Sequence, residues 1–157
     1  MMKWTESNDL PIMAIMIGIQ GSGKSTFCNV HLSEFTRINL DTLHTRNKEN
    51  IAIHNAISEK ENIVVDNTNP TIRERANYIQ KGKEKGYKIL GFFMQSKLQD
   101  CIARNRCREG KEKIPNNAII HTSNKLEIPS YKEGFDKMYF VSIEDGKFKI
   151  EDWRTNE

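Results

Sequence analysis

The stretch Gly18–Ser25, which reads GIQGSGKS, decides the fold of this chain. It matches the phosphate-binding loop G-x-x-x-x-G-K-[ST] at every defined position. The unbroken apolar run before it, IMAIMI at 12–17, predicts a strand buried on both faces, and residues 25–32 behind it can form a helix. In a strand–loop–helix unit of this kind, backbone N–H groups and the helix N-terminus converge on phosphate oxygens. The sequence therefore predicts a nucleoside triphosphate site.

Individual side chains of this loop have expected roles. Lys24 would reach the β- and γ-phosphates, and the Ser25 hydroxyl would ligate Mg²⁺. A glycine- and serine-rich loop that matches by chance is the alternative, and the flanking strand and helix make it improbable. ATP, or another nucleoside triphosphate, and Mg²⁺ are thus the expected cofactors. The residues expected around the nucleotide are Gly21, Ser22, Gly23, Lys24, Ser25 and Thr26.

Composition narrows the class of protein. The chain has 157 residues, a net charge of +3 and 37% hydrophobic residues, and no apolar run approaches membrane-spanning length. Its three cysteines are odd in number and lack metal-ligand spacing, which favours reduced thiols inside a cell. We expect one P-loop kinase domain over residues 1–157, with an irregular lead-in at 1–10. Cytoplasm, nucleus or the cytosol of a host cell are the expected locations, with no membrane partner.

Strand-like and helix-like segments alternate along most of the chain. This order predicts an α/β protein: a P-loop kinase-like three-layer sandwich with a mostly parallel central sheet. The guanine-specific N-K-x-D motif is missing, since NKLE at 124–127 ends in Glu and lies in a predicted helix. Strands are expected at 12–17, 35–39, 63–65, 87–94, 135–143 and 148–150, and helices at 25–32, 48–60, 70–82, 97–107 and 114–126.

Two carboxylates follow predicted strands. Ligands of open α/β sheets lie outside the carboxyl ends of the strands, so Asp41 and Asp66 should both face the phosphate loop. We expect Asp66 to order the Mg²⁺ shell through water, and Asp41 to accept the proton of an acceptor hydroxyl as a general base. The alternative interpretations are structural: Asp66 could cap the helix that follows Pro70, and Asp41 could cap a turn over 42–45.

An arginine-rich segment follows the predicted helix at 97–107. Arg104 and Arg108 are four residues apart and share a helix face, whereas Arg106 points away. We expect Arg104 and Arg108 to clamp the triphosphate, and the basic segment up to Lys113 to close as a lid that excludes water. A solvated helix end is the alternative. Acceptor phosphates could be held by basic residues near the same strand ends: Arg37, His44, Arg46, Arg73 and Arg75.

Four blocks of the sequence resemble the kinase domain of polynucleotide kinase/phosphatase. They are LDTL at 40–43, VVDNTNP at 64–70, NRCRE at 105–109 and IPSYKEGF at 128–135, and Arg75 and Tyr78 extend the match. The resemblance runs from about residue 12 to residue 140, and the bacteriophage polynucleotide kinase is similar in the same blocks.

This resemblance implies ATP-dependent phosphorylation of a 5′-hydroxyl on DNA or RNA, in end-healing or repair. It implies that Asp41 is the general base, that Lys24 and Ser25 hold phosphates and Mg²⁺ beside Asp66, and that Arg108 is the lid arginine. One departure concerns His44, because the phage pattern has an arginine three residues after its base. The phosphatase motif D-x-D-x-T is missing from the sequence, so removal of 3′-phosphates is not expected.

Two other functions compete with this interpretation. The same fold and loop would serve a kinase of a small-molecule hydroxyl, such as a nucleoside, sugar or antibiotic. A nucleotide-binding protein without phosphotransfer is a third possibility, against which Asp41 argues, because a pure binder needs no base beside its phosphates. The sequence leaves open the choice between DNA and RNA, between single and double strands, and among donor nucleotides.

Overall fold

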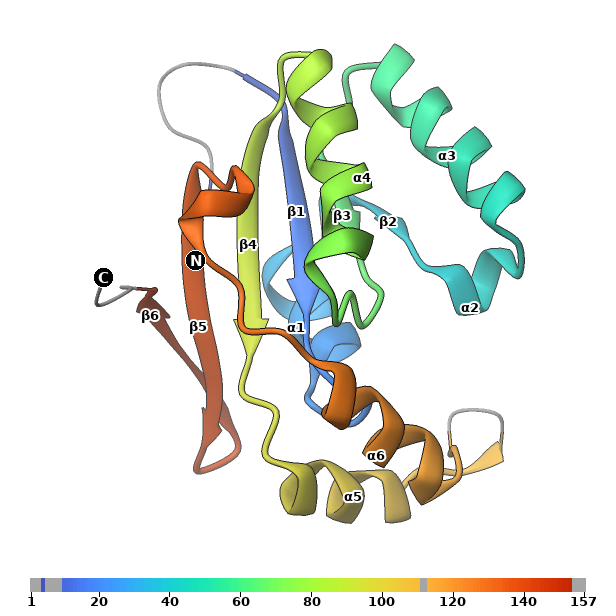
Figure 1. The fold of residues 1–157 in the computed structure, drawn as a ribbon, viewed down its shortest axis with the longest axis vertical. Helices are drawn as coiled ribbons and strands as arrows, with labels where there is room; N and C mark the ends of the chain where they lie inside the picture. Colours follow the sequence, from blue (N-terminus) through green and yellow to red (C-terminus); the bar gives the residue numbers. More distant parts are fainter. Residues whose placement is uncertain (1–3, 5–9, 111–112, 154–157) are drawn as a thin grey trace.

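The computed structural model describes residue 4, residues 10–110 and residues 113–153. Within them, six strands form one sheet in the order β2-β3-β1-β4-β5-β6 (Figure 1). The first five are parallel, and β6 returns antiparallel to β5. The mostly parallel sheet predicted from the sequence is thereby confirmed. The strands are β1 Ile12–Ile17, β2 Thr36–Ile38, β3 Ile63–Val65, β4 Lys88–Met94, β5 Lys137–Glu144 and β6 Lys147–Asp152.

Helices cover both faces of the sheet and so complete the predicted three layers. In the view of Figure 1, α1 lies behind β1, and α4 lies in front of it with α3 at its side. None of the helices in the described part of the chain has the length and apolar character needed to cross a bilayer. The helices are α1 Lys24–His31, α2 Leu40–Leu43, α3 Arg46–Ser58, α4 Ile72–Glu84, α5 Leu98–Arg106 and α6 Asn116–Lys125, and η2 Tyr131–Glu133 is a 3₁₀ turn.

The central strand β1 is buried on both faces because its alternate side chains enter two separate cores. Met13, Ile15 and Ile17 pack with α3, α4 and the start of β5. Ala14 and Met16 pack with α1, β4 and Trp4. The register pairs Ala14 with Val64 of β3 and with Leu90 of β4. This pairing brings the carboxyl ends of β1 and β3 to the same edge of the sheet.

The structure differs from the predicted elements at the places that follow, and the ends of several helices also shift by one or two residues. A short helix, α2, follows β2 where a turn was expected. The segment before β5 forms the 3₁₀ turn η2, so β5 begins at Lys137 rather than at 135. The edge strand β6 is longer than the predicted 148–150. Most of the predicted lead-in and residues 111–112 of the predicted lid lie outside the described residues.

Candidate active site

The phosphate loop connects β1 to α1, as its sequence predicts. Gly21 and Gly23 have φ angles of 83° and 97°, a region that side chains with a Cβ rarely adopt. A Cβ on Gly21 would also lie 2.5 Å from the carbonyl oxygen of Cys101 on α5. The backbone here must therefore be glycine, both for its conformation and for the close approach of α5.

The loop that follows β3 supports the phosphate loop from the side. The Gly18 amide donates to the Thr68 carbonyl at 3.0 Å, and the buried Asn69 side chain donates to the Met16 carbonyl at 2.8 Å. These two bonds join the ends of β1 and β3. Asp66, the first residue of the supporting loop, is thereby held beside the start of α1.

Lys24 begins α1, and its ammonium lies over the phosphate loop. Its Nζ donates to the Ile19 carbonyl at 2.9 Å. Burial lowers the pKa of Lys24 to about 8; the Asp66 carboxylate opposes this shift, and the Arg108 guanidinium adds to it. Phosphate oxygens at the loop would favour the charged form and raise this pKa.

This pKa predicts proton uptake on nucleotide binding. Above pH 8 most Lys24 side chains are neutral, and a bound triphosphate would recharge them, so nucleotide affinity should fall as the pH rises through about 8. Calorimetric titration with ATP in two buffers of different ionisation enthalpy should show more than half a proton taken up at pH 8.5 and little at pH 7. Lys24→Met should abolish the difference. Equal uptake at both pH values would contradict the assignment.

Ser25 and Asp66 form a site whose chemistry fits Mg²⁺. The Ser25 hydroxyl donates to Asp66 Oδ2 at 3.2 Å. The Asp66 residue is 1% exposed, and its buried Oδ1 has no hydrogen-bond partner among the described residues. A buried carboxylate oxygen is costly unless a cation or water meets it, and Mg²⁺ is commonly held by one carboxylate and its own water shell. The two side chains therefore fit the expected ion.

Arg37 contacts the Ser25 and Asp66 side chains and does not lie in the acceptor position expected for it. Its Nε is 2.7 Å from Asp66 Oδ2, and its Nη2 donates to Ser25 Oγ at 3.1 Å. The Arg37 side chain is 39% exposed, so it can leave. A guanidinium and a magnesium ion would use the same two oxygens, and we expect them to compete.

Removing Arg37 should consequently reduce the Mg²⁺ concentration needed for nucleotide binding. We expect Arg37→Ala to lower the half-saturating Mg²⁺ concentration by about tenfold, the equivalent of one charge-assisted hydrogen bond. Titration of a fluorescent ATP analogue with Mg²⁺ measures this directly. Lys85→Ala, which removes an exposed positive charge after α4, should leave the titration unchanged. An unchanged or higher Mg²⁺ requirement in Arg37→Ala would contradict the competition.

A polar cleft of about 220 Å³ lies at this edge of the sheet. It brings together five of the side chains predicted from sequence, although they come from separate elements: the phosphate loop and α1, α2, the end of β3 and the segment after α5. The donor-side lysine and the candidate base thus line one cleft. These five are Lys24, Ser25, Asp41, Asp66 and Arg108.

Asp41 is presented to the cleft by α2, whose N-terminal end is held by two asparagine side chains. Asn39 caps the helix by accepting from the Thr42 amide at 3.1 Å, and the Leu40 amide donates to Asn67 at 2.9 Å. Because Asn39 caps α2 and Thr45 caps α3, the alternative capping role of Asp41 is wrong. The capping alternative for Asp66 is also wrong, since Thr71 caps α4.

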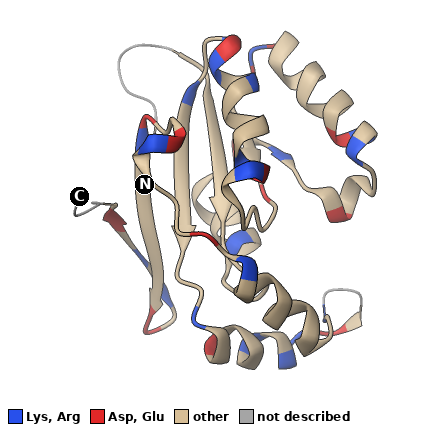
Figure 2. Ribbon diagram, in the orientation of Figure 1, with Lys and Arg blue, Asp and Glu red and all other residues tan. Residues whose placement is uncertain are grey.

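The two arginines chosen for the triphosphate both approach the phosphate loop. Arg104 on α5 donates to the Gly21 carbonyl at 3.1 Å, and Arg108 lines the cleft itself. Arg106 is exposed, as the helical spacing predicts. Figure 2 shows the basic positions along α5 and after it.

A second cavity of about 260 Å³ adjoins the phosphate loop on its other side. Arg104 and Arg108 line it together with Ile143 and Phe148 from the β5–β6 hairpin. Its partly apolar wall suits the nucleoside part of a bound nucleotide. No motif in the sequence marks this contribution of the hairpin, and the strands expected at 135–143 and 148–150 are the signal for the hairpin itself.

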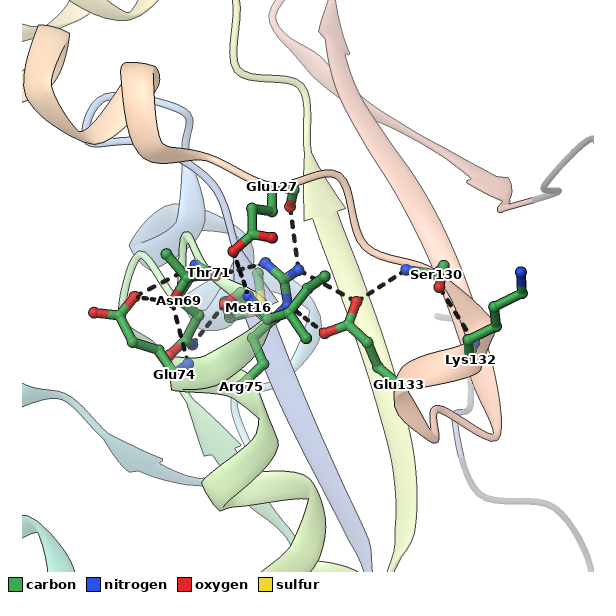
Figure 3. A network of polar contacts seen from close by, with 10 residues as sticks. Met16, Asn69, Thr71, Glu74, Arg75, Glu127, Ser130, Lys132 and Glu133 are labelled. Atoms are coloured by element: carbon green, nitrogen blue, oxygen red, sulfur yellow. Dashed lines mark hydrogen bonds and ion pairs between the residues drawn. The ribbon is translucent and has the colours of Figure 1, made fainter.

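Of the other predicted acceptor residues, Arg46 lines the cleft, whereas His44, Arg73 and Arg75 do not. His44 ends α2 with a φ of 72°, is exposed and lies outside the cleft lining. Arg73 is exposed on α4 and also lies outside it. Arg75 is 0% exposed, and Figure 3 shows it bound to Asn69, Glu127 and Glu133. The expectation that Arg75 holds an acceptor phosphate is therefore wrong, because its guanidinium is enclosed in the protein.

Comparison with known proteins shows the family of this chain. A family model described as an AAA domain matches residues 13–127. The chain belongs to this family. A gluconokinase from Sinorhizobium meliloti has the same fold, with a TM-score of 0.58, 17% identity, and coverage of 85% of this chain and 83% of that one. The AAA-domain chain therefore has the fold of P-loop kinases.

Two curated relatives confirm the resemblance stated from the sequence blocks. This AAA-domain chain is 28% identical over 142 residues to the bifunctional polynucleotide phosphatase/kinase of Schizosaccharomyces pombe, covering 87% of this chain and 34% of that protein. It is 29% identical over 154 residues to the putative bifunctional polynucleotide phosphatase/kinase of Acanthamoeba polyphaga mimivirus, covering 92% and 37%. The chain thus spans about a third of the length of these relatives.

Proposed function

We propose that this kinase transfers the γ-phosphoryl group of ATP to the 5′-hydroxyl end of DNA or RNA, in intracellular end-healing or repair. The observation that carries the proposal is the common cleft of Lys24 and Asp41. A phosphate-binding lysine and a carboxylate that line the same cleft suit a hydroxyl attacking a terminal phosphate. The names of the two curated relatives supply the acceptor class.

In the proposed reaction, Asp41 accepts the proton of the 5′-hydroxyl as that oxygen bonds to the γ-phosphorus. The bond between the γ-phosphorus and the β–γ bridging oxygen breaks, and ADP leaves. Lys24 and Arg108 stabilise the negative charge on the phosphoryl oxygens in transit, and Arg104 holds the phosphate loop through Gly21. Mg²⁺, held by Ser25 and through water by Asp66, would neutralise charge on the β- and γ-phosphates.

A kinase of a small-molecule hydroxyl is the second candidate. The gluconokinase of the same fold favours it, because the fold serves a kinase of a sugar acid there. Transfer to a small acceptor would need the same lysine and the same base. The two functions therefore differ in the acceptor and not in the donor side of the site.

The test is a direct comparison of acceptors. Purified protein is incubated with Mg²⁺, γ-labelled ATP and, separately, 5′-OH DNA, 5′-OH RNA, gluconate and a panel of nucleosides. We expect label on at least one of the two oligonucleotides, in a salt-sensitive reaction, because several phosphate contacts release counterions. Label on gluconate or a nucleoside alone would support the second candidate. ATP binding with no labelled acceptor would support a non-catalytic nucleotide binder.

A further inference from the structure

A second polar groove, of about 500 Å³, opens between α3 and α4. Arg46 and Glu74, at the starts of these two helices, line both this groove and the active-site cleft. The two spaces are therefore neighbours along one surface. Figure 1 shows α3 and α4 running side by side away from α2, the helix that carries Asp41.

Arg46 stands at the junction and is held by a buried pair. Its Nη1 lies 3.1 Å from the Glu49 carboxylate and 2.9 Å from the Tyr78 hydroxyl. Glu49 and Tyr78 are 2% and 4% exposed, whereas the Arg46 side chain is 60% exposed. One nitrogen is thus anchored, and the other N–H groups, which bond to none of the described residues, can bind a phosphate.

The same buried pair also fixes the candidate base. Asn67 donates to Glu49 at 2.9 Å and accepts from the Leu40 amide, next to Asp41, at 2.9 Å. Burial and the Glu49 carboxylate raise the pKa of Tyr78, so its hydroxyl stays protonated and donates to Glu49 at 2.7 Å. Arg46 and Asp41 are therefore held in a fixed relation, which a substrate bridging them would exploit.

A further cation, Lys81, lines the far part of the groove, where it donates to Asn50 at 2.8 Å. Lys81 comes seven positions after Glu74 on α4, a rise of roughly 10 Å at 1.5 Å per residue. A stacked strand advances about 3.4 Å per nucleotide, so this length corresponds to about three nucleotides. Cations thus mark both ends of a path that starts at the cleft.

We propose that Arg46 binds the phosphate on the 3′ side of the acceptor's first nucleoside, and that the strand then follows the α3–α4 groove to Lys81. This inference rests on the proposed function and names how its acceptor is held. It makes Arg46 the substitute for the arginine that the phage pattern has at the His44 position. Glu49 and Tyr78 are positioning residues, because they act through Arg46.

The test is an acceptor-length series measured by label transfer from ATP. A nucleoside 3′-phosphate should be a better acceptor than the bare nucleoside, and 5′-OH oligonucleotides of four to eight residues should be better still. Arg46→Ala should raise KM about tenfold for every acceptor with that phosphate and lower the salt slope by about one. Lys81→Ala should raise KM only for acceptors of three or more nucleotides.

Two further variants distinguish the positioning of Arg46 by Tyr78 from a general loss of activity. Tyr78→Phe removes one hydroxyl and should raise the acceptor KM severalfold while the affinity for ATP is unchanged. Lys85→Ala, at the exposed end of α4, should match the wild type. If Arg46→Ala and Lys81→Ala behave like Lys85→Ala while oligonucleotides are still phosphorylated, the groove assignment is wrong and the proposed function stands. If no oligonucleotide is phosphorylated by the wild type, the proposed function fails first.

Discussion

Replacing Asp41 with asparagine should lower kcat by about 10²–10⁴-fold, the usual contribution of a general base. The substitution keeps the size of the side chain and removes only its ability to take the proton. The Asp41 carboxylate acts on the acceptor oxygen in the transition state, so ATP affinity should stay within about threefold of the wild type. Single-turnover transfer and calorimetric ATP binding measure the two quantities separately.

The effect of Asp41→Asn on turnover should not be confounded by a change in the structure of α2. Asp41 is exposed and caps neither α2 nor α3, so the substitution removes no structural contact of those caps. Glu34→Gln, at another exposed carboxylate, is the matched control and should leave kcat unchanged. Near-normal turnover in Asp41→Asn would show that another group takes the proton.

Replacing Arg75 with alanine should destabilise the protein by about 3–5 kcal/mol, because it leaves a buried carboxylate without its partner. Arg75 Nε lies 2.7 Å from Glu133, whose side chain is 5% exposed, and its Nη1 and Nη2 donate to the Asn69 and Glu127 carbonyls (Figure 3). Thermal unfolding followed by circular dichroism should show a melting temperature lower by roughly 6–20 °C.

Two variants define the cause of that loss. Lys83→Ala breaks an exposed pair with Asp136, at 3.9 Å, and should cost less than about 1 kcal/mol. The double change Arg75→Met and Glu133→Leu removes both charges and should recover part of the loss of Arg75→Ala. A melting temperature for Arg75→Ala equal to that of Lys83→Ala would contradict the structural role.

The Arg75 network also explains why two distant sequence blocks belong to one site. Arg75 fixes the carbonyl of Asn69, and the Asn69 side chain fixes Met16 at the end of β1. The block at 128–135 contributes Glu133, and the block at 64–70 contributes Asn69. The block at 128–135 therefore supports the phosphate loop through Arg75 and Asn69, and none of its residues lines the cleft.

The parts of the site that follow local rules could be predicted from the sequence. The strand, loop and helix over 12–32 are contiguous, so glycine spacing and apolar runs suffice to place them. Asp41 and Asp66 were found because carboxyl ends of parallel strands meet at one edge of the sheet. Both of these carboxylates line the cleft with Lys24.

The roles of single arginines could not be predicted in this way, because a charge does not reveal its partner. Glu133 is 58 residues from Arg75, and Asp66 is 29 residues from Arg37. One signal for Arg75 was present in the sequence: it shares a helix face with Tyr78, Ile79 and Gly82, all of which are buried. An arginine on an apolar face indicates a buried pair more often than a contact with a ligand.

The most direct test of the central claim compares two oligonucleotides that differ in one atom. One ends in a 5′-hydroxyl and the other in a 5′-deoxy nucleoside, and both are incubated with the protein, Mg²⁺ and γ-labelled ATP. We predict label on the first, recovered in its 5′-terminal nucleotide after nuclease digestion, and none on the second. Equal labelling of the two, or label at any other position, would contradict a 5′-hydroxyl acceptor held at Asp41.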